Sequence, residues 1–335
     1  MDNPVLVEVT RGNRVESRHR GAFVIIDAGG QMVAASGDIE RPVFPRSAVK
    51  AIQALPLVES GAADAFGFGE ADLALACASH SGEPGHVERA AAMLASAGLS
   101  EADLECGSHW AADPAVLIEQ ARAMDRPGQL HNNCSGKHAG FLCTCRHLDF
   151  GTSGYVTPGH AEQRLIAETM TAVTGAAHDA GNAATDGCAI PTYAVPLTAL
   201  AEGFARMATG QGLEPVRAAA ARRLLAACMA DPWFMAGTDR FDTRVMQAAP
   251  GRVFLKIGAE GVFCAALPDL GLGIALKADD GAERAAETMV AAVLAYAAAG
   301  RDDDLAACLE TFARRPVLNR NGETVGEIRP AAPLA

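Results

Sequence analysis

A serine and a lysine stand three residues apart in the fragment Ser47-Ala-Val-Lys50. Residues i and i+3 share one face of a helix, so the hydroxyl and the amine come close enough to hydrogen-bond. The positive end of the helix macrodipole disfavours an ammonium there and favours an oxyanion. A neutral lysine can take a proton from a hydroxyl, and the fragment is therefore typical of serine acyl-transfer chemistry. The alternative is a helix-capping serine followed by a solvated lysine.

Two later fragments complete an ordered set. Ser79 lies in Ala78-Ser-His-Ser-Gly-Glu83, and Lys256 begins Lys256-Ile-Gly258. Ser-x-x-Lys, then Ser-x-polar, then Lys-x-Gly is the order found in serine enzymes that use lysine where others use histidine. Taken singly, the first fragment also fits a polar turn and the second a charge on an edge strand. The ordered set predicts an amidohydrolase.

Each member of the set receives a role. We expect Ser47 to attack an amide carbonyl with Lys50 as its base, while Ser79 and Lys256 relay protons to the leaving group; the two serines can exchange roles. Glycine lets the backbone approach a ligand closely, so the N–H groups near Gly258 and Ala259 are candidates for an oxyanion hole together with that of Ser47.

A second constellation carries thiols. The string His131-Asn-Asn-Cys-Ser-Gly-Lys-His138 is followed some fifty residues later by Asp186-Gly-Cys188. Thiolates and imidazoles are good zinc ligands, and a turn of this kind can place two donors on one ion. Buried structural cysteines beside a helix start are the alternative. Cys143 and Cys145 face different ways on a helix, and core packing is expected for both.

Extended structure is expected near both ends of the chain. The β-rich runs before residue 36 include two joined by Gly29-Gly30, a hairpin signal, and three later runs are spaced as an antiparallel meander. The expected strands are 5–10, 22–27, 32–35, 73–77, 252–256, 262–266, 272–276 and 325–328. The expected helices begin near Ser47 and continue at 86–97, 114–124, 138–148, 159–174, 196–208, 214–230, 281–299 and 302–313.

This arrangement predicts an α+β fold in which both termini build one mainly antiparallel sheet with flanking helices and an inserted helical subdomain. Residues 1–60 together with 231–335 are expected to form the sheet-containing domain, and residues 61–230 the mostly helical subdomain. The catalytic site is expected between them.

Composition excludes several classes. The 335 residues include 28 Lys plus Arg against 40 Asp plus Glu, a net charge of −12, and no basic run suggests a nucleic-acid partner. The longest apolar run, 289–299, is far short of the roughly 20 residues of a membrane span. No signal peptide is visible and the nine cysteines form no secreted-type framework, so a cytoplasmic location is expected.

The motifs resemble the L-asparaginase II family of the rhizobial type. The matching strings are Arg46-Ser-Ala-Val-Lys-Ala51, Ala78-Ser-His-Ser-Gly-Glu83, Asn132-Asn-Cys-Ser-Gly-Lys-His-Ala-Gly140, Asp186-Gly-Cys188 and Lys256-Ile-Gly-Ala-Glu-Gly261. They extend over nearly the whole chain. The resemblance implies a fold like that of penicillin-binding proteins and serine β-lactamases, and it implies a homodimer.

The resemblance also implies site roles. Ser47, Lys50, Ser79 and Lys256 match the two serine–lysine tandems of the family. Its zinc ligands correspond to Cys134, Lys137 and Cys188, with one zinc per chain that assists substrate binding rather than generating the nucleophile. Asp186 matches a residue beside the metal, suited to the substrate ammonium or a zinc-bound water, and Arg46 and His138 are candidates for the substrate α-carboxylate.

The expected reaction is the hydrolysis of L-asparagine to L-aspartate and ammonia through a serine ester. Two alternatives stay open. One is another serine–lysine amidohydrolase, such as a glutaminase or a β-lactam hydrolase. The other is a catalytically silent protein that binds zinc or a small molecule. Ammonia release from asparagine, compared with glutamine, separates them.

Overall fold

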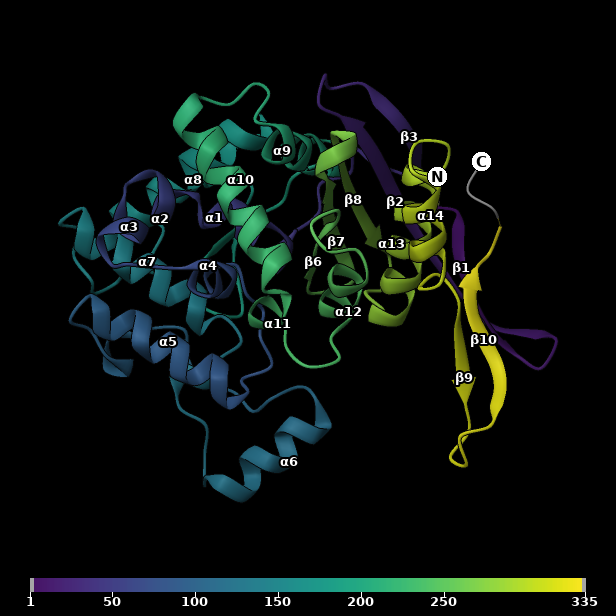
Figure 1. The fold of residues 1–335 in the computed structure, drawn as a ribbon, viewed down its shortest axis with the longest axis horizontal. Helices are drawn as coiled ribbons and strands as arrows, with labels where there is room; N and C mark the ends of the chain where they lie inside the picture. Colours follow the sequence, from purple (N-terminus) through teal and green to yellow (C-terminus); the bar gives the residue numbers. More distant parts are fainter. Residues whose placement is uncertain (1–2, 333–335) are drawn as a thin grey trace.

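A computed structural model describes residues 3–332 of the chain. Its centre is an eight-stranded sheet in which seven strands follow the order β6-β7-β8-β2-β1-β10-β9, and β3 pairs with β2 beside that path. Every pairing in it is antiparallel. Figure 1 shows the strands from the two chain ends side by side. They are β1 (Val5–Arg11), β2 (Arg14–Asp27), β3 (Met32–Ser36), β6 (Phe254–Gly258), β7 (Val262–Leu267), β8 (Leu272–Ala278), β9 (Arg315–Leu318) and β10 (Thr324–Pro330).

The α+β class and the mainly antiparallel sheet predicted from the sequence are confirmed. The meander β6-β7-β8 and the hairpin between β2 and β3 lie where the apolar runs and Gly29-Gly30 place them. The structure adds the first half of β2, from Arg14, and the strand β9. Both alternate exposed and partly buried residues, a pattern that lacks the continuous apolar run of the central strands.

Helices cover both faces of the sheet. Helix α9 (Leu197–Thr209) packs against β2, β7 and β8, and α13 (Glu283–Ala298) packs against β1, β8 and β10. Gly273 of β8 faces Ala205 of α9, whereas Gly21 of β2 faces Met289 of α13. Gly273 pairs with Ile26, and residues 26 and 21 point to opposite sides of a strand. The two helices therefore lie on opposite faces.

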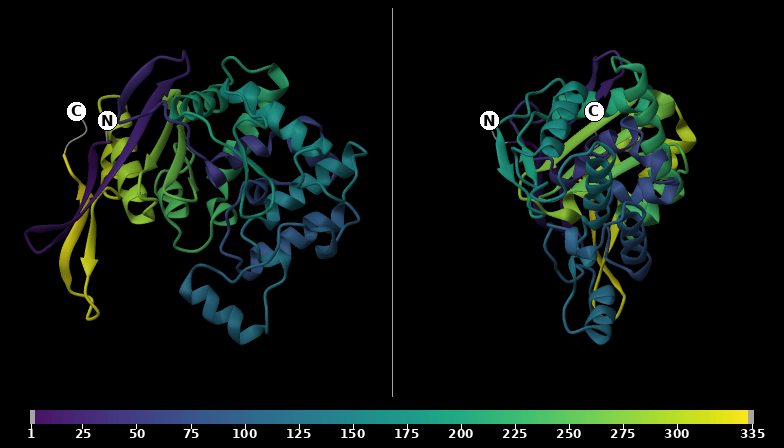
Figure 2. Two further views of the ribbon diagram at one scale, coloured as in Figure 1. Left: turned by 180° about the vertical axis from the view of Figure 1, so that it is seen from behind. Right: turned by 90° about the vertical axis from the view of Figure 1, so that its left-hand side faces the viewer.

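The remaining helices gather beyond the β6 edge of the sheet (Figure 1), and in both views of Figure 2 α6 lies outermost among them. They include α2 (Leu55–Glu59), α3 (Ala62–Ala65), α4 (Glu70–Ala76), α5 (Pro84–Ser96), α6 (Pro114–Ala123), α7 (Ser135–His147), α8 (Ala161–Thr174), α10 (Pro215–Ala230), α11 (Pro232–Met235) and α12 (Phe241–Ala248); α14 (Asp303–Glu310) packs beside α13. A small separate sheet pairs β4 (Ala183–Thr185) with β5 (Pro191–Tyr193).

One predicted strand is wrong. Residues 73–77 belong to or follow helix α4, whose start is capped because Asp72 accepts the Gly69 N–H at 2.9 Å. Its residues Leu73 to Ala76 are all buried, so the apolar run has no polar side to reveal a helical period. Within residues 3–332, no helix has the length and apolar character needed to cross a membrane.

Candidate active site

Ser47 and Lys50 lie at the junction of a short 3-10 turn, η1 (Arg46–Val49), and the one-turn helix α1 (Lys50–Gln53). The Lys50 backbone N–H donates to the Ser47 carbonyl, but no hydrogen bond joins their side chains. Arg46 has a positive φ of 52°, which costs energy for a residue with a Cβ. This strained residue directly precedes Ser47, whose side chain is only half-buried.

Ser79 is the serine that the lysines contact. Its Oγ lies 3.0 Å from Nζ of Lys50 and 2.9 Å from Nζ of Lys256. Both amines are fully buried, at 0% exposure, and the Ser79 side chain is almost so. A hydroxyl can accept a proton from one amine while it donates its own to another. Lys50, Ser79 and Lys256 therefore form one chain along which a proton can move.

Loop contacts and strand packing bring these three residues together. The Ser79 N–H donates to the Met235 carbonyl at 2.9 Å, and the His80 N–H donates to the Asn133 carbonyl at 3.1 Å. At the end of β6, a Cβ on Gly258 would lie 2.2 Å from the Pro45 carbonyl oxygen and 3.1 Å from the Ala48 nitrogen. Only glycine permits this approach of β6 to the segment that carries Ser47.

Burial sets the protonation of Lys256. Removal from water disfavours the ammonium and lowers the pKa of this lysine to about 7. Its Nζ also donates to the Ile257 carbonyl at 2.9 Å. An amine with this pKa is partly neutral at physiological pH, which is the state a general base requires. Lys50 differs in its surroundings, because its Nζ donates to Ala78 O and contacts Cys134 Sγ at 3.0 Å in addition to Ser79.

The predicted zinc ligands come together beside this network. Lys137 Nζ lies 3.0 Å from Cys188 Sγ, and Lys50 Nζ lies 3.0 Å from Cys134 Sγ. A Cβ on Gly136 would meet the Leu75 carbonyl oxygen at 2.4 Å, so the glycine allows the start of α7 to pack on the end of α4. All three predicted ligands are buried.

The charges in this cluster are interdependent. The hydrogen bond from Cys188 lowers the pKa of Cys134 well below the ordinary thiol value, and the same bond raises the pKa of Cys188. Burial opposes the charge on Lys137, yet the facing sulfurs of Cys188 and Cys134 raise the pKa of its amine.

These residues fit a zinc ion by their donor types. Two sulfurs and an amine nitrogen converge, and Asp186 lies next to them with its Oδ2 3.7 Å from Cys188 Sγ. Zinc would have to displace the protons on Lys137 and Cys188, which makes its binding pH-dependent. Among residues 3–332, no group of three His, Cys, Asp or Glu side chains could hold a metal, so zinc here depends on Lys137.

Three side chains predicted to contact the substrate, those of Arg46, Asp186 and His138, differ in their surroundings. Arg46 Nε donates to the Asp186 carboxylate. Burial opposes the charge of Asp186, but Lys137 and Arg46 hold the pKa of this carboxyl below its ordinary value. His138 is fully buried, and its Nδ1 pairs with the Tyr155 hydroxyl at 2.7 Å. Its substrate role stays a prediction.

A cavity of about 510 Å³ opens onto the two serines. Gly258 and Ala259 line it, whereas Arg46, His138 and Asp186 are not in its lining; the substrate role of all five stays a prediction. The complete lining is Ser47, Ser79, Ala112, Asp113, Pro114, Asn133, Arg240, Ile257, Gly258, Ala259, Glu260, Gly261, Gly281 and Glu283. The volume is ample for an amino acid, and the serines of the serine–lysine network, Ser47 and Ser79, line it.

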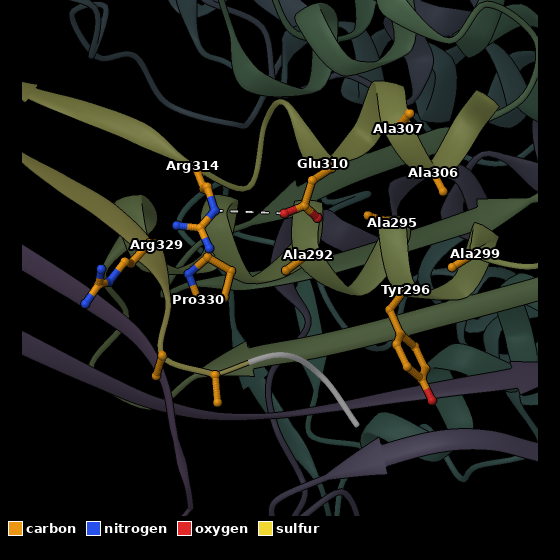
Figure 3. Close-up of a pocket in the computed structure, with 12 residues that line it drawn as sticks. Ala292, Ala295, Tyr296, Ala299, Ala306, Ala307, Glu310, Arg314, Arg329 and Pro330 are labelled. Carbon is orange, nitrogen blue, oxygen red and sulfur yellow. Dashed lines mark ion pairs between the residues drawn. The ribbon is translucent and has the colours of Figure 1, made fainter. Parts of the chain in front are cut away.

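A second cavity, of about 560 Å³, lies between α13, α14 and β10 (Figure 3). Four alanines of these two helices line it together with Tyr296, and two of its charged residues, Glu310 and Arg314, approach each other to 4.0 Å. No serine, lysine, cysteine or histidine is among its described lining residues. Acyl-transfer chemistry therefore belongs to the cavity at Ser47 and Ser79.

Sequence reasoning did not identify Arg240, Asp113 or Asn133, which also line this cavity. Arg240 follows Gly237-Thr-Asp239 and precedes the unpredicted helix α12. A charged residue in such a turn looks like an ordinary solvated loop position. Nothing local distinguishes it, because its place at the cavity comes from the packing of α12 against β6.

Of the remaining cysteines, Cys143 and Cys145 are buried within α7, as predicted for core residues. The Cys143 thiol donates to the Met93 carbonyl, and the Cys145 thiol faces Glu162. Burial raises the pKa of both thiols.

A family model described as L-asparaginase II matches residues 7–330. A search of curated proteins gives no match. Among solved structures, the chain is similar to a β-lactamase (Mb2281c) from Mycobacterium bovis, with 14% identity, a TM-score of 0.44, and coverage of 83% of this chain and 94% of that one. It is also similar to Mglu in its native form, with 17% identity, a TM-score of 0.41, 79% of this chain covered and 60% of that chain.

The sequence match spans all the motifs described above, from Ser47 to Lys256, and nearly the whole of the sheet. The chain belongs to the L-asparaginase II family and is an amidohydrolase of that family.

Proposed function

We propose that this protein hydrolyses L-asparagine to L-aspartate and ammonia through an acyl-enzyme on serine, with lysine as the base. The observation that carries the proposal is the hydrogen-bonded chain Lys50–Ser79–Lys256 beneath a cavity of about 510 Å³. Family membership supports an amide as the substrate. The choice of asparagine rests on the resemblance of the motifs.

Ser47 is the proposed nucleophile because its side chain is the more exposed of the two serines at the cavity. Its Oγ forms a bond to the side-chain amide carbon of the substrate, and Lys50 takes the hydroxyl proton as the proposed base. The backbone near Gly258 and Ala259 closes on the Ser47 segment and supports an oxyanion hole; within the described residues the Ala259 N–H has no acceptor.

Breakdown of the tetrahedral intermediate needs a proton on the leaving nitrogen. The chain Lys50–Ser79–Lys256 is placed to deliver that proton, and ammonia leaves as the β-aspartyl ester forms. Water then attacks the ester carbon and gives a proton to the lysines, which pass it to Ser47 Oγ as the ester bond breaks, so that Ser47 and aspartate are released. The net change is one amide and one water converted to one carboxylic acid and one ammonia.

Cys134, Lys137 and Cys188 are the proposed holders of one zinc ion, with Asp186 beside them. Bound zinc would supply positive charge and a Lewis acid at this position. Without it, the contact between Lys50 and the Cys134 thiol still orients the Lys50 amine toward Ser79. A homodimer and a cytoplasmic location are part of the same proposal and rest on the resemblance and the sequence alone.

The test is ammonia release from L-asparagine and from L-glutamine at equal concentration, followed by mass spectrometry of the quenched enzyme. We expect release from asparagine far above glutamine, and a β-aspartyl adduct on the peptide that contains Ser47. An adduct on the Ser79 peptide would exchange the serine roles. No release from asparagine would reject the activity, and rapid opening of a chromogenic β-lactam would point to the other hydrolase class.

A further inference from the structure

We infer that Arg240 binds the α-carboxylate of the substrate, an assignment that rests on the proposed amino-acid amide hydrolysis. Arg240 is the single cationic side chain among the described residues that line the serine cavity. Three acidic residues, Asp113, Glu260 and Glu283, line the same space. A cavity with charges of both signs suits a zwitterion, whose carboxylate and ammonium need opposite partners.

No hydrogen-bond or ion-pair partner of the Arg240 guanidinium is found among residues 3–332. Its side chain is half-buried, and among the described residues it makes neither a side-chain hydrogen bond nor an ion pair. Arg46, the carboxylate contact expected from the sequence, already donates to Asp186. A planar guanidinium that lines a cavity and is not paired with a carboxylate of the described residues is available for bidentate binding of an external one.

The backbone around Arg240 is held firmly, which fixes where the side chain starts. Glu83 accepts the Thr238 N–H at 2.8 Å and the Thr238 hydroxyl at 2.7 Å. The Thr243 hydroxyl donates to the Gly237 carbonyl at 2.8 Å. Glu83 is only four residues after Ser79, so the loop before Arg240 is tied to the loop that carries the relay serine.

A second contact links the Arg240 segment to Lys256. Arg240 directly precedes α12, and Asp242 in the first turn of that helix accepts the Ile257 N–H at 3.0 Å. Ile257 is the residue after Lys256. The guanidinium, the relay serine and the buried lysine therefore belong to one rigid frame, and a substrate held by its α-carboxylate is presented to both serines in a fixed orientation.

The test compares Arg240→Met with Arg244→Met, a matched control on the same helix whose guanidinium lies 5.7 Å from the Phe312 ring and outside the cavity. The substrates are L-asparagine and 3-aminopropanamide, which is asparagine without its carboxylate. Loss of a charge-assisted bond pair predicts a decrease of about 10- to 100-fold in kcat/KM for asparagine in R240M, mostly through KM. The rate with 3-aminopropanamide should be unchanged, R240K should recover part of the loss, and R244M should match wild type.

Binding of L-aspartate, measured by calorimetry, separates this inference from the proposed reaction. We expect R240M to bind L-aspartate about 10- to 100-fold more weakly than wild type and R244M to bind it equally well. If no ammonia is released from asparagine but this dependence on Arg240 holds, the reaction is wrong and the carboxylate site stands. Equal losses on both amides, full L-aspartate affinity in R240M, or no L-aspartate binding by wild type would overturn the site.

Discussion

Replacement of Lys256 by methionine should abolish activity and at the same time change how stability depends on pH. In the folded protein, burial lowers the pKa of Lys256 to about 7, from an ordinary value of 10.5. Between these values the unfolded chain binds more protons than the folded one, so the free energy of unfolding rises with pH. Below about pH 7 the full penalty of the buried amine is present, and above about pH 10.5 it has vanished.

The size of the change in stability follows from the difference between the pKa of Lys256 in the unfolded and the folded protein. Each pH unit inside the window contributes at most about 1.4 kcal/mol, so wild type should gain about 2 kcal/mol from Lys256 between pH 7 and pH 9. At pH 7 the penalty amounts to about 4 kcal/mol. Methionine removes this penalty, but it also removes the hydrogen bonds of Lys256 to Ser79 and to the Ile257 carbonyl, each of which contributes about 1 kcal/mol to stability. The net stabilisation of K256M at pH 7 is therefore about 2 kcal/mol.

Unfolding of wild type and K256M by urea or guanidinium at pH 7, 8 and 9 measures the stability difference between the two proteins and its change with pH. The buried thiols and acids that titrate in this range are common to both proteins, so the difference between the proteins reports on Lys256. The difference between the two proteins should shrink by about 2 kcal/mol from pH 7 to pH 9. Parallel stability curves would show that Lys256 is not a strained neutral amine. Its assignment as part of the base system would then lose its physical support.

Four further outcomes follow from the same geometry. Ser79→Ala removes the oxygen between the two lysines, so kcat for asparagine should fall by about 10²- to 10⁴-fold with little change in KM, as steady-state kinetics can check. The kcat/KM of wild type should rise with pH through about 7, because Lys256 can take up a proton from Ser79 in the relay only when its own amine is neutral; a flat profile from pH 6 to 8 would contradict this. Gly258→Ala places a Cβ 2.2 Å from the Pro45 carbonyl and should cost about 1–3 kcal/mol of stability in denaturant unfolding, whereas Gly159→Ala, with open space around it, should cost little. Cys188→Ser should lower the zinc content after dialysis, measured by mass spectrometry of the metal, and equal zinc in both proteins would exclude Cys188 as a ligand.

Sequence patterns predicted the sheet well because its strands carry their own signals. The runs of β6 and β7 are buried along their full length and that of β8 at all but one residue, and such runs are distinctive in a sequence. Continuous burial also misled the prediction at Leu73, where the second half of a short helix carries no polar residue. Strand β9 was not predicted, because it lies at the sheet edge, where only alternate residues are partly buried.

The sequence singled out the serines and lysines that the structure places near one another, but it did not predict which of them are in contact. Motif spacing suggested that Lys50 contacts Ser47, three residues before it, whereas the structure joins Lys50 to Ser79. The difference arises because Ser47 belongs to a 3-10 turn and Lys50 to the helix that follows, so the two side chains do not share one α-helical face. Contacts between residues far apart in the chain, such as Lys256 with Ser79, depend on packing that spacing alone does not encode.

The use of lysine in this protein supports a site built around amines that can lose their protons. The chain contains 24 arginines and only four lysines, and three of these, Lys50, Lys137 and Lys256, are fully buried beside Ser79 and the thiols. Arginine carries the ordinary ion pairs of the surface, for example with Glu59 and Asp64. A guanidinium stays charged in proteins, while a buried amine can become neutral and then act as a base or a metal ligand. Ion pairing alone would not require lysine at these three positions, whereas proton transfer and metal ligation do.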